Sequence, residues 1–67
     1  MKLGERIKEM REEKGLAQEQ LAQLLNVKQG TISGWEINRR QPSLEMLKKL
    51  SEVLECDVRY LLGVIDF

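Results

Sequence analysis

The 67-residue sequence contains no histidine and a single cysteine, Cys56. One cysteine cannot form an internal disulfide, and without histidine or further cysteines the usual zinc ligand sets are missing. Cys56 also lacks a histidine that could activate it as a nucleophile, so it is expected to be a small buried core residue. We therefore expect no enzyme activity, no metal and no other cofactor.

Long apolar runs and aromatic side chains are also scarce. No run approaches the roughly 18 apolar residues that a membrane-spanning helix needs, and the N-terminal MKLGERIKEM is charged throughout, unlike a signal peptide. These features predict a cytoplasmic protein. Trp35, Tyr60 and Phe67 are the only aromatic residues, so the core should consist mainly of leucine and isoleucine. The hydrophobic fraction of 42% and the charged fraction of 33% are typical of a single folded domain.

The formal net charge is zero, whereas a general polyanion binder is usually strongly basic. This average hides an asymmetry along the chain. In residues 28–40, Lys28, Arg39 and Arg40 are accompanied by a single glutamate, whereas residues 41–67 contain more acidic than basic side chains. Whether the charges are also separated in space depends on the fold.

Apolar residues recur at helical spacing in five segments. Leu3, Ile7 and Met10, for example, stand at i, i+4 and i+7 with charged residues between them, which predicts an amphipathic helix. The same reasoning predicts helices at residues 2–14, 18–25 and 28–36, a fourth that follows the N-cap Ser43 and buries Leu44, Leu47, Leu50 and Leu54, and a short fifth that runs from the N-cap Asp57 to Leu62.

Short turns separate the predicted helices. Gly15, Asn26 and Gly63 suit the left-handed backbone conformation that ends a helix, and no segment shows the sustained alternation of a strand. The sequence therefore predicts a compact all-α domain of five helices. Because only a tight turn at residues 26–27 joins the second and third helices, these two form a helix-turn-helix.

The third predicted helix, in VKQGTISGWE, contains two glycines, although each glycine in a helix interior costs about 1 kcal/mol relative to alanine. On a helical wheel its apolar residues lie on one side, and Gln29, Gly30, Ser33 and Gly34 lie on the other. The outward face is thus small, uncharged and able to form hydrogen bonds.

Such a face suits the major groove of DNA, which is about 12 Å wide and admits a helix. Gln29 could contact N6 and N7 of adenine, and Ser33 could contact several base edges. The two glycines would let the helix backbone approach DNA closely. The alternative is that both glycines are neutral drift on a solvent-exposed face.

Four motifs follow one another along the chain: LGERIKEMREEKGL, QEQLA, TISGWE and PSLEMLKKL. In this order and spacing they resemble the lambda-repressor-like, XRE-type helix-turn-helix domain of phage repressors and bacterial regulators. The resemblance covers about residues 3–62 of a single domain at 1–67, with 63–67 as an apolar tail. It implies a transcriptional regulator, preferentially a repressor, that binds double-stranded DNA as a homodimer on a palindromic operator. A single domain of this size leaves little room for a small-molecule effector.

The resemblance also implies roles for individual residues. Gln18 matches a phosphate contact at the start of the second helix, and the recognition-helix positions that face bases or backbone match Lys28, Gln29, Gly30, Ser33 and Gly34. The loop that binds phosphate after the recognition helix matches Asn38, Arg39 and Arg40. An internal ion pair between the first and third helices matches Arg11 and Glu36.

Several positions depart from that family's pattern. Ala17 and Lys28 stand where serine or threonine N-caps are usual, Glu55 replaces a glycine at a helix end, and Leu24 is apolar where polar residues are usual. The neutral net charge keeps an alternative function open, a protein-interaction module with the same fold and weak or no DNA binding. The apolar C-terminal residues could pack on their own domain or pair with a second subunit; they are Tyr60, Val64, Ile65 and Phe67.

Overall fold

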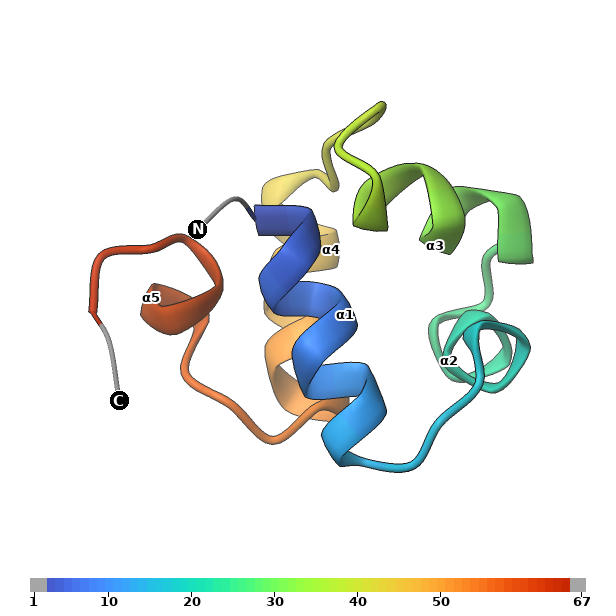
Figure 1. Ribbon diagram of the computed structural model, residues 1–67, viewed down its shortest axis with the longest axis horizontal. Helices are drawn as coiled ribbons and strands as arrows, with labels where there is room; N and C mark the ends of the chain where they lie inside the picture. The colour runs from blue at the N-terminus through green and yellow to red at the C-terminus, as the bar shows by residue number, and fades with distance from the viewer. Residues whose placement is uncertain (1–2, 66–67) are drawn as a thin grey trace.

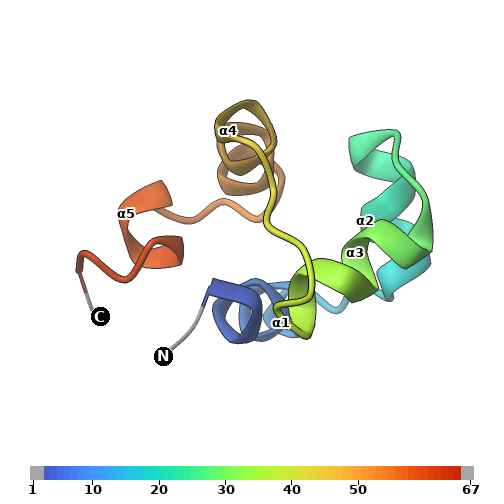
Figure 2. The same ribbon diagram turned by 90° about the horizontal axis from the view of Figure 1, so that it is seen from above.

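The computed structural model describes residues 3–65, and these residues form five α-helices. The helices are α1 (Leu3–Glu13), α2 (Gln18–Leu25), α3 (Gln29–Glu36), α4 (Leu44–Val53) and α5 (Val58–Leu61). Helices α1 and α4 form the centre of the molecule, with α2 and α3 on one side and α5 on the other (Figure 1, Figure 2). The expected all-α fold of five helices is confirmed.

The helix boundaries follow from local hydrogen bonds. Oγ of Ser43 accepts from the backbone N–H of Met46 at 3.1 Å, which starts α4, and Oδ1 of Asp57 accepts from the N–H of Arg59 at 2.8 Å, which starts α5. Both predicted N-caps are therefore confirmed. The left-handed conformation expected at the helix ends is found at Gly15 (φ +70°), Asn26 (φ +58°) and Gly63 (φ +79°).

Neither helix of the helix-turn-helix has a side-chain cap at its start. Ala17 and Lys28 have the extended backbone of N-cap residues but make no side-chain capping bond. At α2, Oε1 of Gln20 accepts from the N–H of Ala17 at 2.7 Å, which is one half of a capping box. Nothing equivalent is found at Lys28 within residues 3–65, and the N–H groups of Gln29 and Gly30 make no hydrogen bond there, so they remain available to a ligand.

Leucine and isoleucine dominate the core, as expected from the shortage of aromatic residues. The buried apolar side chains come from all five helices and the residue after α4: Ile7, Leu21, Ala22, Leu25, Ile32, Trp35, Leu47, Leu50, Leu54 and Leu61. The prediction that Leu44 belongs to this set is wrong, because 82% of its surface is exposed. Leu44 stands at the edge of the apolar stripe of α4, and Met46 of the same turn packs against the core instead.

Gly4 allows α1 to pack closely on the end of α3. A Cβ atom at this position would overlap the backbone carbonyls of Trp35 and Glu36, so only glycine fits here without a backbone shift. The N–H of Gly4 also donates to Oδ1 of Asn38 at 3.0 Å, with Asn38 itself in the left-handed conformation (φ +62°). The first helix is thus tied directly to the loop that follows α3.

The C-terminal segment packs on its own domain as far as Ile65. Arg6 is buried, and its Nη1 donates to the backbone carbonyls of Tyr60 at 3.0 Å and Ile65 at 3.3 Å. Its guanidinium also lies 4.4 Å from the centre of the Tyr60 ring, a cation–π geometry. Val64 nevertheless leaves 69% of its surface exposed, and Phe67 lies outside the described residues.

Cys56 is partly buried against the core rather than fully enclosed. Desolvation by burial raises the pKa of its thiol, which keeps it protonated and poorly nucleophilic.

Within residues 3–65, each helix is too short or too polar to cross a membrane.

Candidate nucleic-acid interface

A left-handed turn sets the geometry of α2 and α3. Asn26 adopts φ +58°, its N–H donates to the carbonyl of Gln23 at 3.2 Å, and the N–H of Val27 donates to the carbonyl of Ala22 at 2.9 Å. The chain therefore turns sharply between the two helices, and they share a core that includes Leu21 and Ile32. This helix–turn–helix presents the outer face of α3 at the surface.

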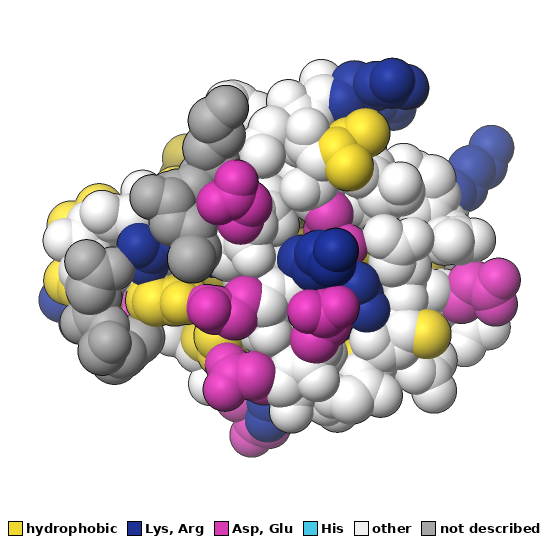
Figure 3. Space-filling model, viewed as in Figure 1, with side chains coloured by type: hydrophobic (Ala, Val, Ile, Leu, Met, Phe, Trp, Pro, Cys, Tyr) yellow, Lys and Arg dark blue, Asp and Glu magenta, His cyan; other side chains and the backbone are white. Residues whose placement is uncertain are grey.

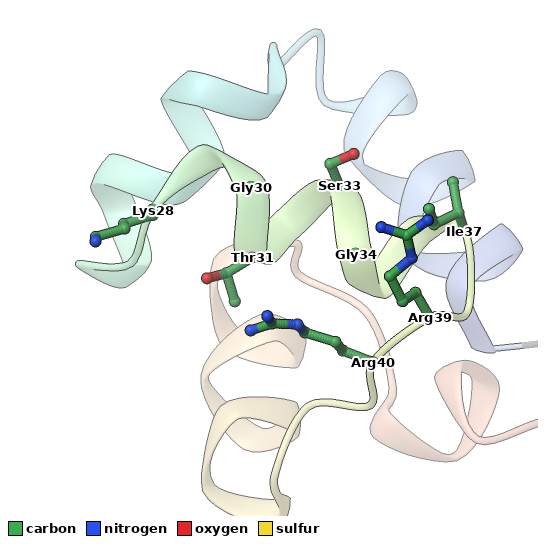
Figure 4. A pocket seen from close by; sticks show the side chains of 8 residues that line it. All are labelled: Lys28, Gly30, Thr31, Ser33, Gly34, Ile37, Arg39 and Arg40. Atoms are coloured by element: carbon green, nitrogen blue, oxygen red, sulfur yellow. The ribbon is translucent and has the colours of Figure 1, made fainter.

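A groove of about 570 Å³ runs along this face of α3 and the loop after it. It is lined by Lys28, Gly30, Thr31, Ser33, Gly34, Ile37, Arg39 and Arg40 (Figure 4). The lining includes three cationic side chains and no carboxylate, so the groove favours a negatively charged ligand. Lys28 lies at one end of the groove and Arg39 at the other (Figure 4).

The basic side chains of the groove have no partner in the part of the chain that the structure describes. Within residues 3–65, the side chains of Lys28, Arg39 and Arg40 make no hydrogen bond or ion pair, whereas Arg11, Lys14 and Arg59 are paired with Glu36, Glu55 and Asp57. Cations that the fold does not neutralise are available to phosphate groups.

Acidic side chains gather elsewhere. A second depression, along α1, is lined by Lys8 and by Glu5, Glu9, Glu12, Glu13 and Glu36. Figure 3 shows acidic side chains over α1, with basic ones among them, and further basic side chains along the edge formed by α3 and its following loop. A net charge of zero is thus compatible with a groove whose lining is basic, so it does not argue against an anionic ligand for the groove.

A buried ion pair joins α1 to α3. Nε of Arg11 donates to Oε2 of Glu36 at 2.6 Å, and Nη2 donates to Oε1 at 3.1 Å. This bidentate bond with Glu36 raises the pKa of Arg11. Nη1 of Arg11 also donates to the carbonyl of Leu16 at 2.7 Å. The structure thus contains the ion pair that the family resemblance implied, and both charges are compensated in a buried position.

Gln18 extends this network to the surface. Its Nε2 donates to Oε1 of Glu36 at 2.9 Å, and its Oε1 accepts from Nε2 of Gln29 at 3.1 Å. Gln29 is exposed at the start of α3, so the first side chain of that helix is held in place by a chain of hydrogen bonds that begins in the core. The amide oxygen of Gln29 makes no bond within residues 3–65 and can accept one from a ligand.

The two glycines of α3 have different surroundings. Gly30 is exposed, and a Cβ there would meet nothing within 4 Å, as expected. Gly34 is buried, so the expectation that it faces solvent is wrong. The aliphatic part of Arg40 lies across it, with Cδ only 3.4 Å from the position of a Cβ. A helical wheel could not show this, because the covering side chain comes from the loop after the helix.

The groove also contains two residues that the sequence pattern did not single out. Thr31 is partly buried and points into the groove, and Ile37 exposes 61% of its surface beside Arg39 (Figure 4). On the helical wheel Thr31 lies near the apolar side, and Ile37 falls in a polar loop, so neither belonged to the predicted outer face. The path of the loop brings Ile37 into the groove.

The fold and this site define a helix-turn-helix domain. A helix-turn-helix family model matches residues 7–61, and the chain belongs to this XRE-type, lambda-repressor-like helix-turn-helix family. It is 38% identical over 63 residues to the HTH-type transcriptional regulator ImmR of Bacillus subtilis, covering 94% of this chain and 50% of that protein. It is 39% identical over 61 residues to SinR of the same organism, covering 90% of this chain and 55% of SinR. The chain thus spans about half the length of these curated relatives.

Solved structures give the same result. The P22 c2 repressor in complex with a synthetic operator matches with a TM-score of 0.86 and 34% identity, covering 91% of this chain and 92% of that one. SinR in complex with DNA matches with a TM-score of 0.83 and 39% identity, covering 90% of this chain and 97% of that one. Both of these structures are complexes of a regulator with DNA.

Proposed function

We propose that this chain is a sequence-specific transcriptional regulator that binds double-stranded DNA through the groove along α3. The observation that carries the proposal is the arrangement of Lys28, Arg39 and Arg40, three cations that are unpaired within residues 3–65. They surround an uncharged helix face, with no carboxylate among the lining residues. The complexes of the similar P22 c2 repressor and SinR with DNA support it. Repression is the mode of regulation we favour, by analogy with the P22 c2 repressor.

In this proposal α3 enters the major groove, and its polar side chains read base edges. Gln29, oriented by Gln18, offers an amide to adenine, and Ser33 offers a hydroxyl to several bases. The exposed Gly30 allows the helix backbone to lie close to the bases, since a Cβ there has no protein neighbour within 4 Å.

The cations are assigned to phosphate. Arg39 would bind the backbone at one end of the groove and Lys28 at the other, since these two residues stand apart along α3, and Arg40 would bind between them (Figure 4). Gln18 and Asn38 would add contacts through amide hydrogens that remain free, because Nε2 of Gln18 carries two hydrogens and Nδ2 of Asn38 makes no bond within residues 3–65. Such contacts fix the position of the domain on DNA without reading its sequence.

A single domain of this kind has few base readers, so we propose that it acts as a homodimer on a palindromic operator. Half-sites for such dimers lie about 34 Å apart, one helical turn of DNA. The exposed Leu62 and Val64, at the end of α5, are available for a contact between subunits.

A binding experiment tests the proposal directly. Duplexes selected by the protein from a random pool should share a motif with two-fold symmetry, and binding to them should weaken steeply as salt concentration rises, because each phosphate contact releases counterions. If no motif is enriched and binding to DNA does not depend on salt concentration, the result would instead favour a protein-interaction module with the same fold.

A further inference from the structure

The side chain of Arg40 packs against the backbone of Gly34. A Cβ at Gly34 would lie 3.4 Å from Cδ, 3.5 Å from Cγ and 3.8 Å from Cβ of Arg40. The backbone is fixed at the same point, since the N–H groups of Arg39 and Arg40 both donate to the carbonyl of Gly34, at 2.9 and 3.2 Å. The backbone of Arg40 and the aliphatic stem of its side chain are thus both held against α3.

Because its aliphatic stem lies against α3, Arg40 places its guanidinium in the basic groove. Figure 4 shows the side chain of Arg40 running along α3, with its guanidinium below Thr31. Within residues 3–65 no acceptor binds this guanidinium. A planar fork of N–H donors in this state suits a phosphate group, which it can bind with two parallel hydrogen bonds.

We propose that Gly34 is a positioning residue for Arg40, so that the guanidinium is ordered before a phosphate of the DNA backbone binds to it. This inference rests on the proposed function. It replaces a direct role for Gly34 in close approach, because the stem of Arg40 already covers Gly34 while Gly30 remains open. Ordering a long side chain in advance removes an entropy cost that binding would otherwise carry.

Two substitutions of different size test the packing of Arg40 on Gly34. The methyl group of Gly34→Ala would be in ordinary van der Waals contact with the stem of Arg40, so this variant should bind DNA nearly as well as the wild type. The longer side chain of Gly34→Gln must occupy the space of the stem, and it should weaken binding to a random-sequence duplex by about 3- to 10-fold. Gly30→Gln is the control for direct obstruction: it places the same side chain on the face of α3 that is proposed to approach DNA, but away from Arg40, so any loss that it causes should not depend on Arg40.

A double-mutant cycle with Arg40→Ala separates positioning from simple obstruction. If Gly34 acts through Arg40, Gly34→Gln should cause less than about a 2-fold further loss once Arg40 has been removed. Gly34→Gln alone should also lower the dependence of binding on salt by roughly one phosphate contact. Gly30→Gln and Arg40→Ala should be additive, since the two positions share no contact. Thermal unfolding of each variant checks that it folds.

Three outcomes would overturn the inference. Equal losses from Gly34→Gln with and without Arg40 would mean that the side chain obstructs DNA directly. Unchanged binding by Gly34→Gln would mean that the packing of Arg40 on Gly34 does not affect DNA affinity. A wild-type protein that binds no duplex would overturn the proposed function and this inference together, whereas the first two outcomes leave DNA binding intact.

Discussion

Nε2 of Gln29 donates to Oε1 of Gln18 at 3.1 Å, so the first residue of α3 is held by the first residue of α2. Gln18 is itself fixed by Glu36, which receives a second set of hydrogen bonds from Arg11. An exposed side chain proposed to read bases is therefore connected to a buried ion pair. A reader that is held in one orientation discriminates between bases better than a mobile one.

Gln18→Ala should reduce the ability of the protein to choose its operator. Without Oε1 of Gln18, Gln29 loses its fixed orientation, so the ratio of operator affinity to random-duplex affinity should fall about 2- to 10-fold. Gln23→Ala, an exposed glutamine of the same helix, is the control and should leave the ratio unchanged. An equal loss on both duplexes would show that Gln18 acts only through phosphate.

Glu36→Ala should destabilise the domain strongly. The substitution leaves the guanidinium of Arg11 buried without its carboxylate, and breaking a buried ion pair from one side costs about 3–5 kcal/mol. Chemical denaturation should show a large loss in the free energy of unfolding, and Lys14→Ala, which breaks an exposed pair with Glu55, should change it little. A midpoint unchanged by Glu36→Ala contradicts the structural role of the pair.

Local sequence patterns were sufficient to predict the five helices, because periodicity, N-caps and left-handed turn residues act over a few positions. They were also sufficient for the outward face of Gln29 and Gly30. They misplaced Leu44, which stands at the edge of its stripe, where a small rotation of α4 decides between burial and exposure. Burial at such an edge depends on the neighbouring helices and not on spacing.

The groove itself depends on contacts between elements distant in sequence or on the path of a loop. Gly34 and Gly30 are equivalent on a helical wheel, and only the course of the following loop places Arg40 over one of them. Similarly, no local pattern shows that Gly4 packs against the end of α3. The family resemblance supplied the Arg11–Glu36 pair but not the extension of that pair through Gln18.

Acidification should remove the stabilising effect of the Asp57 cap. The hydrogen bonds from Arg59 lower the pKa of Asp57 from 3.8 to about 2. Because the folded-state pKa is lower than the unfolded one, the contribution to stability is complete above about pH 4 and is lost as the pH falls towards 2. Melting temperatures measured across this range should fall more for the wild type than for Asp57→Asn, which keeps an N-cap but cannot titrate. Parallel curves would contradict this role for the carboxylate.

Glu55→Gly should stabilise the domain. Glu55 has φ +53° at the end of α4, a left-handed conformation that is unfavourable for residues with a Cβ but not for glycine. Removing this strain should raise the melting temperature by about 4–8 °C, and the lost exposed ion pair with Lys14 should subtract little. Glu55→Ala loses the same ion pair but keeps the strain, so it should give no such increase. If the glycine and alanine variants melt at the same temperature, strain at Glu55 is not significant.

Arg39→Ala should weaken DNA binding without changing its sequence preference. Arg39 lies in the basic groove, and its guanidinium has no partner within residues 3–65, so its proposed role is a phosphate contact that is the same on every sequence. Binding to operator and random duplexes should weaken by the same factor, and the slope of log affinity against log salt should fall by roughly one. Ser33→Ala, at a proposed reader, should instead alter the preferred motif and leave the slope unchanged. A new motif selected by Arg39→Ala would show that this arginine reads bases, and the division between positioning and reading residues along the groove would have to be redrawn.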